Sequence, residues 1–102
     1  MYDWKPVVGF EGIYVVRPGK DGGKVKRIVP IKRSRVGKEL GKPDKSGYIR
    51  AVLSRPGEPP KYVRLHALIL AAFVGPKPDG MEACHRDDCK HNNTLENLYW
   101  GI

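Results

Sequence analysis

One apolar segment limits the folds open to this chain more than any other feature of its sequence. Between residues 65 and 74, apolar side chains recur every three or four positions over an alanine-rich background, at Leu65, Leu68, Ile69, Ala72 and Phe73. That spacing predicts a helix, and Gly75 followed by Pro76 predicts its end. The segment is shorter than the ~18 apolar residues that a membrane span needs, so we expect no membrane partner.

The rest of the chain favours short strands separated by turns. Residues 4–16, 24–31, 47–54 and 61–64 contain many β-branched, aromatic and other apolar side chains, and turns rich in glycine and proline separate several of them. We predict a β-hairpin from 47–54 and 61–64, an exposed basic loop over 32–46, and short strands at 82–86 and 98–100. Together with the helix, these elements predict an α+β fold with a small N-terminal antiparallel β-sheet, a helix and a C-terminal hairpin.

Positive charge is concentrated in the first part of the chain. The net charge is +8, and residues 1–60 carry 14 basic and six acidic side chains, whereas residues 61–102 carry five of each. Such a bias favours a polyanionic partner, although a solubilising face is the alternative. We therefore predict a basic, β-rich DNA-binding module over 1–60 that contacts double-stranded DNA. Its candidate phosphate contacts are Lys24, Lys26, Arg27, Lys32, Arg33, Arg35, Lys38, Lys42 and Lys45.

A second group of polar residues lies near the C-terminus. It runs from Cys84 to Trp100 and contains His85, Asp87, paired asparagines at 92 and 93, and Asn97. This pattern resembles the signature of phage and intron-encoded HNH endonucleases, and residues 63–76 are similar to the helix and exit loop that precede it there. Residues 4–16 are similar to a DNA-binding module often fused ahead of HNH domains. The resemblance therefore covers most of the chain and implies a ββα-metal module over 61–102.

The resemblance also implies roles for individual residues. His85 would be the general base of phosphodiester hydrolysis, Asn97 would hold the loop that orients it, and Asp87 and Asp88 would bind Mg²⁺ or Mn²⁺. The sequence departs from the family pattern in two places: Cys84 stands where some relatives have an acidic ligand, and Asp88 stands where glycine is usual. Relatives continue into a helix with the last metal ligand, so we expect a truncated module here.

Other functions remain open from the sequence. Cys84, His85, Cys89 and His91 are possible zinc ligands by residue type, but their spacing is poor for a tetrahedral site. The chain could also be a catalytically inactive HNH-derived module that regulates phage DNA or inhibits a host nucleic-acid enzyme, and it could pair with a second copy of itself. His66 is expected to be a packed core residue. The N-terminus lacks a signal peptide pattern, so we expect a cytoplasmic protein. The resemblance to phage endonucleases implies a phage protein in a bacterial host.

Overall fold

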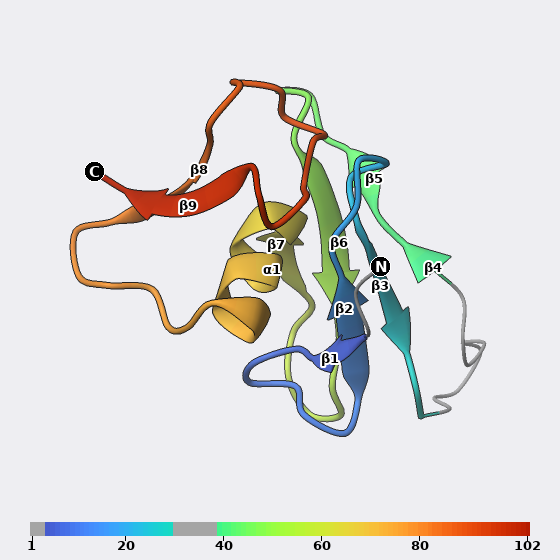
Figure 1. Cartoon of the computed structure of the whole chain (residues 1–102). Coiled ribbons are helices and arrows are strands. Elements are labelled where there is room, and N and C mark those ends of the chain that lie inside the picture. The colour runs from blue at the N-terminus through green and yellow to red at the C-terminus, as the bar shows by residue number, and fades with distance from the viewer. Residues whose placement is uncertain (1–3, 30–38) are drawn as a thin grey trace.

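The computed structural model of this chain describes residues 4–29 and 39–102. Within these residues, three antiparallel sheets surround one helix (Figure 1). The first sheet has the order β1-β2-β3-β4, the second β5-β6-β7, and the third is the hairpin β8-β9. The elements are β1 (Lys5–Pro6), β2 (Tyr14–Arg17), β3 (Lys24–Arg27), β4 (Glu39–Leu40), β5 (Lys42–Pro43), β6 (Ile49–Leu53), β7 (Lys61–Arg64), α1 (Leu65–Phe73), β8 (Glu82–His85) and β9 (Leu98–Gly101).

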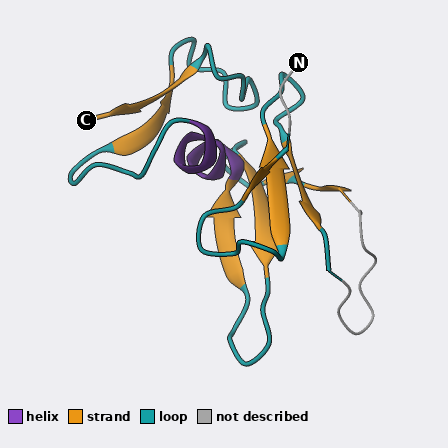
Figure 2. Ribbon diagram, turned by 60° about the horizontal axis from the view of Figure 1, so that its bottom comes forward, coloured by secondary structure: helices purple, strands orange, loops and turns teal. Residues whose placement is uncertain are grey.

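Helix α1 lies between the C-terminal hairpin and the other two sheets (Figure 2). It contacts strands of all three sheets, and it follows β7 without an intervening loop. Alternation in β2 and β3 sends Tyr14 and Val16 inward from one strand and Val25 inward from the next. These side chains join one hydrophobic core, whose buried members are Val7, Phe10, Tyr14, Val16, Val25, Ala51, Leu53, Leu65, Ile69, Leu70 and Leu98.

The core crosses the position where the sequence suggested a division into 1–60 and 61–102. Strand β7 pairs with β6 across that position, from Arg50 opposite Arg64 to Leu53 opposite Lys61. Leu53 on one side and Leu65 on the other are both fully buried in the same core. The two parts are therefore packed as one body, and a division between them can only be one of function.

Most of the predicted elements are confirmed. The fold is α+β, the helix spans 65–73, and the hairpins β6–β7 and β8–β9 occupy the predicted segments. The predicted loop over 32–46 is wrong for β4 and β5, which add short edge strands to β3 and β6. These two-residue strands are held by backbone pairing, which leaves no alternation of side chains to detect. In the part of the chain described, no helix is long and apolar enough to cross a membrane.

Candidate active site on the C-terminal hairpin

The candidate site is built on the hairpin β8–β9 and on the loop that joins its strands. His85 is the last residue of β8 and pairs with Leu98, the first residue of β9. Pairing continues one step further, where the Arg86 N–H donates to the Asn97 carbonyl at 2.8 Å. His85 is therefore fixed at the point where the hairpin opens into its loop, and it is only 8% exposed.

Asn93 determines which nitrogen of the His85 ring carries the proton. The Asn93 side-chain amide donates from Nδ2 to the Gly22 carbonyl at 2.8 Å, and its Oδ1 lies 2.7 Å from His85 Nε2. A carbonyl oxygen can only accept, so Nε2 must donate. In the neutral ring the lone pair is then on Nδ1, and this is the nitrogen that can accept a proton.

Asn97 links the two ends of the loop through hydrogen bonds of its side chain. Its Nδ2 donates to Asp87 Oδ1 and to the Asn92 carbonyl, both at 2.8 Å, and its Oδ1 accepts from the Asp87 N–H at 3.1 Å. Asp87 also accepts from Asn92 Nδ2 and from the Cys89 N–H. Hydrogen bonds from Asn92, Cys89 and Asn97 lower the pKa of Asp87 to about 2.

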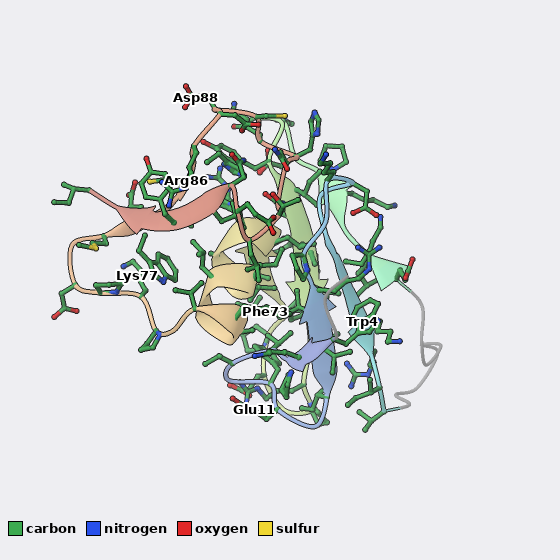
Figure 3. The ribbon with its side chains drawn as sticks, viewed as in Figure 1. Trp4, Glu11, Phe73, Lys77, Arg86 and Asp88 are labelled. Carbon is green, nitrogen blue, oxygen red and sulfur yellow. The ribbon has the colours of Figure 1, made fainter. Side chains whose placement is uncertain are left out.

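Asp88 has a left-handed backbone conformation. Its φ is 59°, in the left-handed region, and among the residues that the structure describes it is the only non-glycine residue with a positive φ. Glycine adopts this region without steric cost, whereas aspartate does so at some cost. Asp88 lies at the tip of the loop, where its carboxylate is exposed (Figure 3).

Two aromatic rings pack beside His85. The His66 ring is stacked on the His85 ring with centroids 4.7 Å apart, and Tyr48 is stacked on His66 at 5.3 Å. His66 comes from α1 and is 5% exposed, which agrees with its expected place in the core. Burial, the nearby His85 and Arg64 lower the pKa of His66 to about 4 despite a backbone hydrogen bond at Ala83, so the ring is neutral at pH 7.

His85 opens onto a hollow of about 350 Å³ in the surface. The lining residues come from β8, its loop, β9 and the turn before β6: Tyr48, Glu82, Ala83, Cys84, His85, Asp88, Lys90 and Tyr99. The hollow therefore holds one imidazole, one lysine and two carboxylates beside aromatic side chains. Sequence reasoning missed Tyr48, Glu82 and Lys90, because their proximity depends on how distant elements pack.

The C-terminal part of the chain, which contains this site, is similar to known endonucleases. Residues 63–101 match the model of the HNH endonuclease family, and this span contains α1, β8, β9 and the whole loop from His85 to Asn97. Residues 63–101 are therefore similar to the HNH endonuclease family. A solved structure of the HNH homing endonuclease I-HmuI, described for DNA binding and cleavage, is also similar, with a TM-score of 0.76 and 33% identity.

The I-HmuI match extends beyond the HNH segment. It covers 97% of this chain, including the N-terminal sheet, and 52% of that endonuclease, so this chain spans about half its length. No match was found among curated proteins. The α+β arrangement of this chain is therefore the arrangement found in one part of an HNH homing endonuclease.

The donor groups near the HNH site do not form a complete metal site on their own. Asp87 has both carboxylate oxygens engaged by the loop, whereas Asp88 and Glu82 line the hollow. Among the residues described, no three metal-binding side chains come close enough to hold an ion. The zinc alternative is not supported, because Cys89 contacts His91 at 3.3 Å but His85 Nε2 is bonded to Asn93.

The predicted phosphate contacts are in different environments. Lys42 and Lys45 are exposed, and Lys26 lies 4.3 Å above the Trp4 ring, near the partly buried Lys24. Arg27 does not fit the prediction: it is 4% exposed and donates to the Tyr14 hydroxyl and to backbone carbonyls. Alternation in β3 turns Arg27 inward with Val25. Lys32, Arg33, Arg35 and Lys38 lie outside the described residues.

Two cations that the sequence analysis did not select lie near the site. Arg64 lies 4.1 Å from the centre of the Tyr48 ring, and Lys90 lies 4.8 Å from it. Tyr48 itself is 6.0 Å from the His85 ring. Basic residues near the candidate base thus come from the HNH segment, which the even charge balance of residues 61–102 did not indicate.

Proposed function

We propose that this chain binds double-stranded DNA and that its HNH segment hydrolyses phosphodiester bonds, with His85 as the general base. The observation that carries the proposal is the bond from His85 Nε2 to Asn93, which leaves Nδ1 as the proton-accepting nitrogen of a residue that lines the hollow. A base with a defined tautomer and a fixed ring plane is what activation of a water molecule requires. The match of residues 63–101 to the HNH endonuclease family model supports the same reaction.

In this proposal the protein holds the base, and nearby charges stabilise the phosphate. His85 takes a proton from the attacking water, while stacking against His66 keeps the ring plane fixed. Lys90 and Arg64, which both lie close to the Tyr48 ring, would lower the cost of negative charge on the phosphate. We propose a requirement for Mg²⁺ or Mn²⁺, which would supply further charge neutralisation.

The DNA-binding part of the proposal depends on the basic strands of the N-terminal half. Lys42 and Lys45 are exposed, and both precede β6, close in sequence to the Tyr48 that borders the hollow. Side chains of this kind contact phosphates without reading sequence. Similarity to I-HmuI, described for DNA binding, extends over this half and supports the assignment. We also propose, from the sequence, a phage protein acting in the bacterial cytoplasm.

A plasmid-nicking assay tests the enzyme. Supercoiled plasmid is incubated with the protein and Mg²⁺ or Mn²⁺, and we expect nicked or linear product. His85→Ala should lower the rate by about 10²-fold or more, because that is the usual contribution of a general base. His91→Ala is the matched control, since it removes an exposed histidine of the same loop whose described contact is Cys89.

A second function is favoured by a specific observation at the site. Asp87 is committed to the loop, and Cys84 occupies the position before the base, so the described residues offer few ligands for a hard cation. This favours a catalytically inactive module that regulates phage DNA by binding it or inhibits a host nucleic-acid enzyme. If the plasmid stays supercoiled with every divalent ion while the protein still binds DNA, the inactive binding module replaces the endonuclease as the proposed function.

A further inference from the structure

We infer that the turn between β2 and β3 of the N-terminal sheet is part of the catalytic apparatus, because it acts through Asn93 to fix the proton of His85 on Nε2. Asn93 is then a positioning residue, and the turn is its support. The effect on cleavage rests on the proposed function, but the position of the proton can be measured in a protein that cleaves nothing.

The contacts join two regions that are far apart in sequence. Asn93 is completely buried, and its side-chain amide bridges the Gly22 carbonyl and His85 Nε2. Its backbone also pairs with Gly19 in both directions, at 2.9 Å and 3.0 Å. The loop of the HNH segment is thus attached to the β2–β3 turn by three hydrogen bonds, all made by Asn93.

The Gly22 carbonyl decides the orientation of the Asn93 amide. The two ends of a side-chain amide differ only in that one accepts and the other donates. A carbonyl cannot face the Asn93 oxygen favourably, so Nδ2 must point at Gly22 and Oδ1 at His85. If that carbonyl were absent, the amide could rotate and donate to Nε2, and Nδ1 would then carry the proton. A backbone group 71 residues from Asn93 therefore selects the basic nitrogen.

The turn is built to hold that carbonyl in place. Asp21 accepts from the Gly23 N–H at 3.1 Å and forms an ion pair with Arg17 at 3.1 Å. Gly22 has a φ of 98°, and a Cβ there would lie 2.7 Å from the Ile49 side chain. Both the backbone conformation and the lack of space require glycine at this position.

The other neighbours of the ring cannot select the tautomer. His66 and Tyr48 contact His85 through ring faces, which restrict its plane but distinguish neither nitrogen. The described hydrogen bond of the His85 side chain is the one to Asn93. Removal of the Asn93 amide should therefore let the proton of the His85 ring occupy either nitrogen, while the plane of the ring stays fixed.

The experiment is ¹⁵N NMR of histidine-labelled protein near neutral pH, which distinguishes Nε2–H from Nδ1–H at each ring. In the wild type we expect the pattern of the Nε2–H tautomer for His85. Asn93→Leu should give a mixture of the two tautomers. Asn92→Leu is the matched control: it removes the neighbouring amide, which bonds Asp87, and should leave the His85 pattern unchanged.

The role of the turn is tested from its own side. Gly22→Ala displaces the carbonyl without touching the HNH segment, and it should shift His85 toward a mixture of tautomers. Nδ1–H in the wild type would overturn the inference, even if no variant folds. An unchanged His85 pattern in folded Asn93→Leu or folded Gly22→Ala would also overturn it. Loss of plasmid cleavage alone, with the tautomer results as expected, would contradict only the proposed function.

Discussion

The replacement His66→Phe gives a direct test of how burial affects the centre of this fold. His66 is 5% exposed, and its Nδ1 has no hydrogen-bond partner. Its pKa is about 4 in the folded protein against 6.5 for an ordinary histidine, so between these values the unfolded chain binds the proton more readily. Stability is then complete above about pH 6.5 and falls as the pH drops toward 4.

The magnitude follows from the two pKa values. Between about pH 7 and about pH 4.5, His66 should remove at most about 2 kcal/mol from the free energy of unfolding. Phenylalanine keeps a ring stacked between Tyr48 and His85 but binds no proton. We therefore expect His66→Phe to lose less stability over this interval than the wild type, by about that amount.

The assay is urea denaturation followed by circular dichroism at both pH values. The difference between wild type and variant isolates His66 from His85, which both proteins retain. His91→Phe serves as the control, because it makes the same replacement at an exposed histidine. Parallel losses of stability in wild type and His66→Phe would refute the reasoning.

Four further predictions follow from other contacts. Tyr14→Phe should cost about 2 kcal/mol in thermal denaturation, because the hydroxyl accepts from buried Arg27 at 2.7 Å. Asp88→Gly should raise stability by up to about 1 kcal/mol in the same assay, since it relieves a left-handed backbone. Asp87→Asn should lower the melting temperature above about pH 4. The wild type loses the stability contributed by the Asp87 carboxylate as the pH falls through about 2, because the pKa of Asp87 is lowered in the folded protein, and the variant should show no such loss. Lys42→Ala should lower the magnitude of the slope of the logarithm of DNA affinity against the logarithm of salt concentration by about 1, the value for one lost phosphate contact, in fluorescence titrations.

Three of these predictions have a matched control variant. Tyr62→Phe removes the hydroxyl of a ring that is 64% exposed and should leave stability unchanged. Asp79→Asn and Lys77→Ala alter exposed groups outside the loop and outside the basic half. The role of the Tyr14 hydroxyl is contradicted if Tyr62→Phe costs as much stability as Tyr14→Phe, and the strain at Asp88 is contradicted if Asp88→Gly lowers stability. The roles of Asp87 and Lys42 are contradicted if Asp79→Asn and Lys77→Ala have the same effects as Asp87→Asn and Lys42→Ala.

The sequence predicted those parts of the fold that leave a periodic pattern. Helix α1 and strand β6 bury alternate or helically spaced apolar side chains, so both could be located. Strands β4 and β5 have no fully buried side chain, and their existence depends on backbone pairing with distant strands. Arg27 was misjudged for a related reason, because its charge suggested solvent while its position in β3 turned it inward.

The site was predictable only within the motif. The pairing of Asn97 with Asp87 links residues ten apart in one loop, and the family pattern contains both. The contacts of His85 with His66 and Tyr48, and of Asn93 with Gly22, join segments that meet only after folding. Their physical basis is tertiary packing, which no local spacing encodes.

Strand β7 limits where a shortened form of this chain can begin. The family match begins at Val63, inside β7, whereas its partner β6 lies upstream, and α1 starts directly after Arg64. A fragment that started at Val63 would carry half a hairpin with unpaired backbone groups, which favours aggregation. A shortened protein that keeps this hairpin must therefore start ahead of β6.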